Sequence, residues 1–167
     1  DRIFYRNKLD TQTVLQNYSR NLTEVADLPR IIQTLRQQVT DLYRPERLYV
    51  YLLDTQTNLF CAQPDSTMPR LPMSAAQCAS DGPLAKWIKS EPGPKYLSAN
   101  RVLPENLRDD QERIDTIGTM LYVPLSGRGR INGWLTLSHK QSDQPYSTDD
   151  LNLMSALANQ TALALER

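Results

Sequence analysis

The order of elements over residues 119–167 constrains the fold more than any other feature of the sequence. Two short runs, TMLYVPL and GWLTLSH, flank a glycine-rich turn and precede one long helical pattern. Successive side chains of a strand point to opposite faces, so each run has an aliphatic face and a face of aromatic and hydroxyl side chains. The first face comprises Leu121, Val123, Leu125, Leu135 and Leu137, and the second comprises Met120, Tyr122, Trp134 and Thr136. The first suits packing beneath helices. The second suits either a pocket for a flat, polar molecule or an ordinary second core.

A long helix is predicted to begin after Ser147 and to run to the last residue of the sequence. Ser147 and Asp150 have the spacing of a capping box, in which each side chain accepts a hydrogen bond from the other's backbone N–H. Apolar residues then recur in two stripes, so one stripe can cover the sheet while the other meets a partner helix. The pattern reaches Arg167 without a terminating Gly or Pro. We therefore expect the helix to continue beyond Arg167 into an output domain.

The first 26 residues are predicted to form a linker helix with a thin apolar stripe over residues 9–24. Because so thin a stripe does not make a self-sufficient core helix, we expect this helix to pair with its own copy in a homodimer. Residues 1–8 mix basic and aromatic side chains. They are interpreted either as a juxtamembrane segment of a membrane-tethered protein or as a solvated helix start. The candidate dimer residues are Val14, Tyr18, Leu22, Met154, Thr161 and Leu165.

A second helix and a first hairpin follow. Asp27 is the predicted N-cap of the helix, and Pro45 ends it because proline disfavours helix at the residue before it. Residues 47–54 are rich in Tyr, Val and Leu, which is typical of a strand. They repeat the division into an aliphatic and an aromatic face, with Tyr51 on the aromatic one. Residues 59–63 are predicted to return as the hairpin partner.

The middle of the chain shows less periodicity. Residues 63–80 hold several prolines and are predicted to be a loop, a class of segment that is often functional when long. Residues 83–90 are predicted to form a short helix with Trp87 on its apolar side. Residues 95–98 read as a short strand. Residues 100–117 are polar and contain one predicted helical turn.

Composition excludes several classes of function. Lys plus Arg equals Asp plus Glu at 19 each, which argues against a nucleic acid or an anionic membrane surface as the main partner. No apolar run approaches the roughly 20 residues that span a bilayer. Cys61 and Cys78 lack CxxC spacing and read as the reduced thiols of a cytoplasmic protein, with a single disulfide as the alternative.

From about Asp27 onward the sequence resembles a GAF domain. The resemblance implies an α+β fold, an α/β/α sandwich with a PAS-like antiparallel sheet of five to six strands. The N- and C-terminal helices would cover one face, and short helices and loops the other. It also divides the chain into a linker over residues 1–26 and a GAF domain over residues 27–167. The motifs that carry it are Val123-Pro124-Leu125, Gly133-Trp134-Leu135-Thr136-Leu137, Tyr146-Ser147 and Asp150-Leu151.

The resemblance further implies a regulatory sensor module of a bacterial signalling protein, with no enzymatic activity in this fragment. A small ligand would bind between the aromatic sheet face and a lid of loops. The N-terminal linker resembles those of sensor kinases, so a histidine kinase is the expected output. A module that only dimerises, without a ligand, is the alternative. The candidate pocket residues are Tyr51, Trp87, Met120, Tyr122, Trp134 and Thr136.

The known ligands of the family leave marks that this sequence lacks. A bilin is attached through a cysteine commonly next to His, but Ala79 follows Cys78. The Asn-Lys-x-Phe-Asp-Glu motif of cyclic-nucleotide binders is absent, and His139 is poorly placed as a haem ligand. No metal-ligand spacing occurs. The cofactor is therefore unknown. A methionine sulfoxide reductase with Cys61 or Cys78 as nucleophile is the enzymatic alternative, although such relatives use three cysteines.

Overall fold

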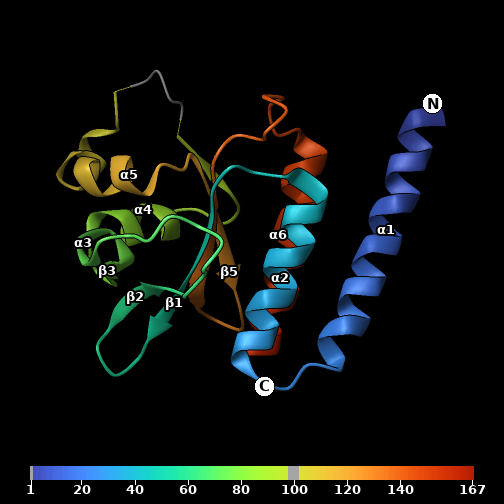
Figure 1. Ribbon diagram of the computed structural model, residues 1–167, viewed down its shortest axis with the longest axis horizontal. Helices are drawn as coiled ribbons and strands as arrows, with labels where there is room; N and C mark the ends of the chain where they lie inside the picture. The colour runs from blue at the N-terminus through green and yellow to red at the C-terminus, as the bar shows by residue number, and fades with distance from the viewer. Residues whose placement is uncertain (1, 98–101) are drawn as a thin grey trace.

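A six-stranded antiparallel sheet separates two unequal layers of helices and loops (Figure 1). The computed structural model describes residues 2–97 and 102–167. The strand order is β3-β2-β1-β6-β5-β4, and every neighbouring pair is antiparallel. This arrangement confirms the predicted α+β sandwich. The strands are β1 (Leu48–Asp54), β2 (Leu59–Ala62), β3 (Gln77–Ala79), β4 (Lys95–Tyr96), β5 (Leu121–Ser126) and β6 (Ile131–Leu137).

Three long helices form the layer on one side, which we call the helix layer: α1 (Arg2–Thr23), α2 (Leu28–Tyr43) and α6 (Thr148–Leu165) (Figure 1). The sheet face beneath them, the helix face, carries the aliphatic residues of the central strands, as predicted. The predicted caps are also present. Asp27 accepts a hydrogen bond from the Arg30 N–H at 3.0 Å, and Ser147 and Asp150 form the reciprocal capping box.

Helix α1 starts at Arg2, earlier than the apolar stripe suggested. The side chains of residues 2–9 and all of residue 1 lie outside the described part, so both interpretations of residues 1–8 stand. The stripe of α1 meets α6 of the same chain. The Tyr18 hydroxyl and Thr161 Oγ1 are 2.6 Å apart, and both residues are fully buried.

That contact shows where the candidate dimer residues lie in the monomer. Leu22 and Met154 are also buried within the monomer, and Val14 and Leu165 are partly buried against the same core. The polar surroundings of the α1 stripe led us to expect a second copy, whereas the sheet-covering helix supplies the missing apolar partner. Most of the stripe is therefore buried within the monomer, and homodimerisation stays a prediction.

The other layer, here called the lid, consists of the loop 63–72 and four short helices. These are α3 (Met73–Ala76), α4 (Pro83–Lys89), the 3₁₀ helix η1 (Glu105–Asp110) and α5 (Gln111–Ile117). The expectation of an uninterrupted loop over residues 63–80 was wrong, because α3 and β3 lie within it. Strand β3 forms by pairing with β2, with Cys78 opposite Phe60. Three residues are too few to show alternation, so the sheet neighbour and not the local pattern decides this strand.

The two layers pack on opposite faces of β1 and β6. The backbones of these two strands approach each other closely at Gly133. A Cβ at this position would lie 1.8 Å from the Tyr51 carbonyl oxygen. Only glycine therefore permits the register that places Gly133 opposite Leu52. The register between β1 and β6 determines which of their side chains face the helix layer and which face the lid.

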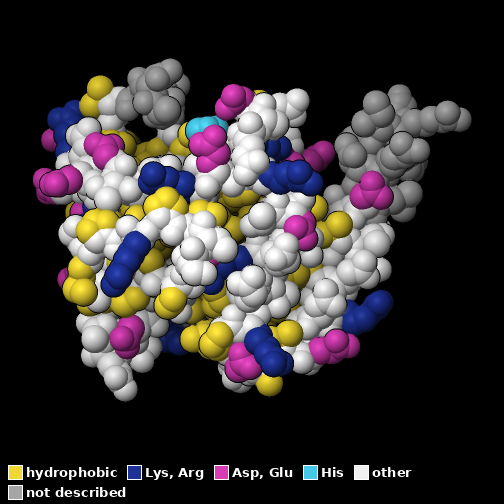
Figure 2. Space-filling model, viewed as in Figure 1, with side chains coloured by type: hydrophobic (Ala, Val, Ile, Leu, Met, Phe, Trp, Pro, Cys, Tyr) yellow, Lys and Arg dark blue, Asp and Glu magenta, His cyan; other side chains and the backbone are white. Residues whose placement is uncertain are grey.

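On the face shown in Figure 2, the side chains of Lys and Arg are interspersed with those of Asp and Glu. This distribution agrees with the zero net charge of the sequence. Among residues 2–97 and 102–167, no helix combines the length and the apolar character needed to cross a bilayer.

Candidate functional site

The sheet face opposite the helix layer is a cluster of aromatic rings, which we call the ring face. It comprises Tyr49, Tyr51, Phe60, Tyr122 and Trp134. The Tyr51 and Trp134 rings are stacked with centroids 5.2 Å apart, and the Phe60 ring lies 4.6 Å from that of Trp134. Such pairs add roughly 0.5–1.5 kcal/mol beyond simple burial. The predicted division between an aliphatic and an aromatic face is therefore present.

Two tyrosines of β1 fasten the lid to the ring face by their hydroxyl groups. Tyr51 donates a hydrogen bond to the Ala75 carbonyl of α3 at 2.8 Å, and Tyr49 donates to the Pro69 carbonyl of the loop 63–72 at 2.9 Å. Burial raises the pKa of both tyrosines, so both hydroxyls keep their protons. The polar ends of these rings thus bind backbone of the lid itself.

A buried ion pair links the lid helices to one another. The Asp110 carboxylate is hydrogen-bonded to the Arg113 guanidinium, and it also accepts a hydrogen bond from the Leu84 N–H at the start of α4, at 2.9 Å. Arg113 Nε donates to the Ser74 carbonyl of α3, at 2.8 Å. One pair therefore connects α3, α4, η1 and α5. Sequence reasoning missed it, although the (i, i+3) spacing in a polar segment was the available signal.

Arg47 fastens the last lid helix to the sheet. Its Nη1 donates to the carbonyls of Thr116 and Ile117 at 3.3 and 3.1 Å, which satisfies the C-terminal carbonyls of α5. Gly118 follows with φ +72°, and a Cβ there would lie 2.6 Å from Arg47 Nη1. The left-handed backbone favours glycine here, and any larger residue would also displace the guanidinium from α5.

The predicted pocket residues fall into two groups. Tyr51, Tyr122, Trp134 and Thr136 are fully buried on the ring face, and Trp87 of α4 packs against the Tyr122 ring with centroids 5.7 Å apart. Met120 instead packs against the helix-face core. It precedes the first residue of β5, so the alternation of that strand does not extend to it.

Hydroxyl groups form a short chain inside the ring face. Thr136 Oγ1 donates to the Leu121 carbonyl at 2.9 Å and lies 2.6 Å from Thr119 Oγ1, which donates to the Tyr122 hydroxyl at 3.3 Å. Burial raises the pKa of Tyr122 to about 12 despite these hydrogen bonds. The indole Nε1 of Trp134 is buried without a hydrogen-bond partner among the described residues, which is a costly arrangement for a donor.

The ring face is closed over most of its area and open at one edge. A hollow of about 560 Å³ lies beneath the loop 63–72 and is lined by Tyr49, Met68 and Leu71, among others. Its described lining does not include Tyr51, Tyr122 or Trp134. A molecule could reach those rings only if the lid moved away from them.

The two thiols lie on opposite faces of the sheet. Phe60 is paired with Cys78, and the next residue, Cys61, therefore points the other way. Neighbouring cysteines on opposite faces cannot form a disulfide without rearranging the strands. Burial raises the pKa of Cys78 to about 12, so this thiol lacks the thiolate character that a nucleophile needs. These observations favour the interpretation as reduced thiols and weaken that of Cys78 as a nucleophile.

His139 lies at the surface end of β6, as expected, within 3.4 Å of Glu46 and 3.7 Å of Asp143. It has no contact with the ring face. In the part of the chain that the structure describes, no group of three or more His, Cys, Asp or Glu side chains is arranged to hold a metal ion.

The sequence model of one family, described as "GAF domain", matches residues 25–166. The chain belongs to the GAF domain family. The match begins two residues before the boundary expected at Asp27. A search among curated proteins finds no match for this GAF domain.

Solved structures share the fold at low sequence identity. A methyl-accepting chemotaxis protein, residues 122 to 287, is 14% identical over 90% of this chain and 95% of that one, with a TM-score of 0.70. The GAF domain of a protein assigned as a sensor histidine kinase in Pseudomonas syringae pv. tomato is 15% identical over 97% and 89%, with a TM-score of 0.58. Free methionine-R-sulfoxide reductase from Neisseria meningitidis is 17% identical over 93% and 88%, with a TM-score of 0.64. The family and the signalling contexts of the first two support a sensory or regulatory module.

Proposed function

We propose that this GAF domain is the sensor module of a signalling protein, in which the lid and ring face receive a signal and the helix layer transmits it. A small ligand binds between lid and ring face, and the output domain is a histidine kinase. The observation that carries the proposal is that β1, β5 and β6 contact the lid on one face and the helix layer on the other. On one face, Tyr49 and Tyr51 of β1 are hydrogen-bonded to the lid, and on the other face the three strands pack against α2 and α6.

The lid contacts define two states that a ligand can distinguish. With the lid closed, Tyr49 and Tyr51 bond to lid carbonyls and Trp134 has an unpaired indole N–H. A ligand that enters through the hollow beside Tyr49 and accepts a hydrogen bond from that N–H would favour an opened lid. A ligand shifts such an equilibrium only by the difference between its affinities for the two states.

Homodimerisation through the helix layer is part of the proposal, with a revised contact. Leu163 of α6 is 43% exposed, whereas Tyr18 and Thr161 are buried within the monomer. Leu163→Asp should therefore shift a dimer toward monomer in sedimentation velocity, while Asn159→Asp on the same exposed side of α6 should not. Equal behaviour of both variants would remove Leu163 from the contact.

Native mass spectrometry of the gently purified chain tests the ligand part. We expect a retained small molecule whose occupancy falls about tenfold in Thr136→Val, since a hydrogen bond to a buried group contributes on the order of 1 kcal/mol or more. Thr116→Val, which removes an exposed lid hydroxyl, is the control and should retain the molecule. If neither the wild-type protein nor Thr116→Val retains a molecule, ligand binding is contradicted.

A ligand-free relay is the second candidate, and the complete burial of Tyr51, Tyr122 and Trp134 favours it. In that case the signal enters from a neighbouring domain along α1. A full-length protein whose output responds to Tyr18→Phe but not to Thr136→Val would support this alternative over ligand sensing.

A further inference from the structure

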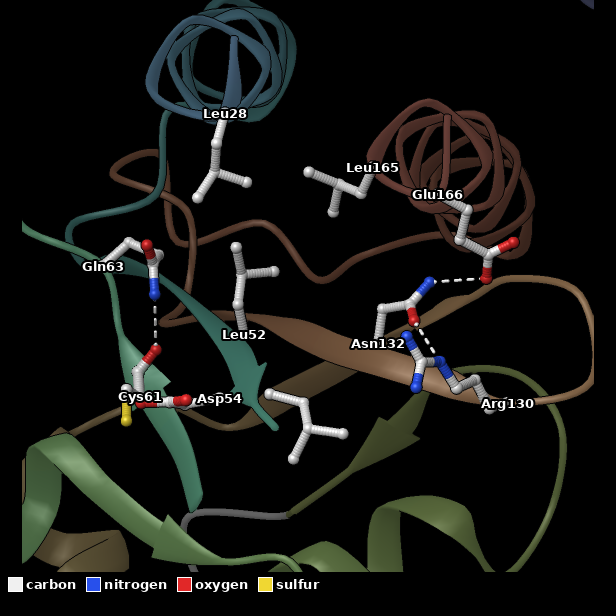
Figure 3. A pocket seen from close by; sticks show the side chains of 10 residues that line it. Leu28, Leu52, Asp54, Cys61, Gln63, Arg130, Asn132, Leu165 and Glu166 are labelled. Carbon is white, nitrogen blue, oxygen red and sulfur yellow. Dashed lines mark hydrogen bonds between the residues drawn. The ribbon is translucent and has the colours of Figure 1, made fainter. Parts of the chain in front are cut away.

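A second hollow, of about 380 Å³, lies on the helix side of the sheet, away from the ring face (Figure 3). It is bounded by the first residue of α2, the C-terminal end of α6, and residues of the neighbouring strands β2, β1 and β6. Leu28 and Leu165 extend from the two helices toward Leu52 on the strand below (Figure 3). Leu28 is 47% exposed at the start of its helix. Four leucines therefore line the hollow: Leu28, Leu52, Leu53 and Leu165.

The opposite wall of the hollow carries a chain of polar groups. Arg130 Nε donates to Asn132 Oδ1 at 3.1 Å, and Asn132 Nδ2 donates to the Glu166 carboxylate at 2.8 Å. The Arg128 N–H also donates to both oxygens of that carboxylate, at 3.0 and 3.1 Å. These bonds hold the pKa of Glu166 below its usual value. The end of α6 is thereby attached to the β5–β6 turn.

Arg130 is the residue with a guanidinium in the lining of the hollow, and it has donors to spare. Its terminal nitrogens donate no hydrogen bond to any residue of the described ranges. A guanidinium presents two parallel N–H groups that match a carboxylate. The lining also holds the carboxylates of Asp54 and Glu166, so within it an incoming anion has Arg130 as its charged partner and must bind on the side of the guanidinium turned away from them.

We propose that this hollow binds a small aliphatic carboxylate, with its chain between Leu28, Leu52 and Leu165 and its carboxylate on Arg130. The same guanidinium orients the Asn132 amide toward Glu166. Binding at Arg130 therefore alters how the last turn of α6 is held. The site is separate from the lid and goes beyond the function proposed above.

Hexanoate is a suitable probe, with acetate and hexan-1-ol as controls that lack the chain and the charge. In a titration followed by ¹H–¹⁵N NMR, we expect saturable shifts at the amides of Leu28, Leu52 and Leu165. Affinity for both controls should be at least about tenfold weaker, because each lacks one of the two contacts. Equal affinity for hexanoate and hexan-1-ol would overturn the role of the carboxylate.

Variants of the two turn arginines test the site itself. Arg130→Gln should weaken hexanoate binding by about tenfold. Arg128→Gln is the matched control and should bind normally, because only the backbone N–H of Arg128 holds Glu166. Equal affinities of the two variants would overturn the proposal.

Two further outcomes would also overturn it. One is a set of shifts centred on Trp134 and Tyr122, which would place hexanoate at the ring face and leave ligand sensing there untouched. The other is a ligand-free dimer, seen by light scattering, that covers Leu28 and excludes hexanoate. Failure of hexanoate to bind has no bearing on the molecule sought by mass spectrometry.

Discussion

The two faces of the central sheet are packed by different kinds of contact. On the helix face, aliphatic side chains meet the stripes of α2 and α6, and these contacts have little directional preference. On the ring face, Tyr49, Tyr51 and Arg47 bond to particular carbonyls of the lid. We therefore expect the helix layer to adjust by small sliding movements, and the lid to be either bonded or detached. A sensor needs both properties, one in the layer that responds and one in the layer that receives.

Two adjacent buried residues of β6 give the strongest test of this contrast. Trp134→Ala should lower the free energy of unfolding by about 3–5 kcal/mol, and Leu135→Ala by about 2–5 kcal/mol, as measured by urea unfolding followed by circular dichroism. Amide hydrogen exchange should then separate them. We expect faster exchange first in the lid of Trp134→Ala and first in α2 and α6 of Leu135→Ala. Identical exchange patterns would show that the two faces unfold as one unit.

The Asp110–Arg113 pair gives the next largest effect. Arg113→Ala leaves the Asp110 carboxylate without its charged partner inside the lid. Loss of one member of a buried pair costs about 3–5 kcal/mol, and we expect about 1–3 kcal/mol because the Arg113 side chain is 26% exposed. Urea unfolding measures the loss. Arg108→Ala, at an exposed position of η1, is the control, and an equal loss there would mean that the pair does not hold the lid together.

A matched pair of hydroxyl deletions compares the layers more finely. Tyr51→Phe removes the bond to the Ala75 carbonyl, and Tyr18→Phe removes the bond to Thr161. Each should cost about 1 kcal/mol. Hydrogen exchange should increase around α3 in the first variant and along α1 in the second. A change in the lid caused by Tyr18→Phe would show that the layers are coupled already without a ligand.

The smallest expected effect concerns the pH dependence of the helix layer. Burial raises the pKa of Asp150, but hydrogen bonds from Lys140 and Ser147 outweigh it and leave the pKa below its usual value. A carboxyl group with a lowered folded-state pKa stabilises the protein above the unfolded value of about 3.9, and this contribution is lost as the pH falls through the folded value.

Asp150→Asn should therefore flatten the acid limb of a plot of unfolding free energy against pH and lower stability at neutral pH by about 0.5–1 kcal/mol. Urea unfolding at a series of acid and neutral pH values measures both changes. Asp149→Asn, at an exposed neighbour outside the capping box, should keep the wild-type limb. If both variants behave alike, the capping box does not contribute to the pH dependence.

The parts of the fold that follow from local patterns could be predicted from the sequence. Alternation in β5 and β6 gave the two faces, and the spacing of Ser147 and Asp150 gave the start of α6. Strand β3 could not be foreseen, because it depends on pairing with β2.

In the candidate site, too, contacts between residues distant in the sequence could not be predicted from local patterns. Aromatic character predicted that Tyr51 and Trp134 lie on the lid side. It could not predict that the Tyr51 hydroxyl bonds to Ala75, since that contact is made across the fold. The partner of the α1 stripe was also unpredictable, because a thin apolar stripe meets a second copy or a distant helix equally well.

The parallel course of α1 and α6 has a mechanical consequence. Tyr18 lies beside Thr161, and Arg167 Nη2 bonds to the Leu22 carbonyl at 2.9 Å, so both helices run toward the same end of the molecule. Because the two helices are packed side by side, a rotation of α1 about its axis would turn α6 in the opposite sense. A shift of α1 along its axis would move α6 in the same direction. A rotation or a shift of α1 would thus reach α6 directly, and from α6 it would reach β5, on which α6 packs.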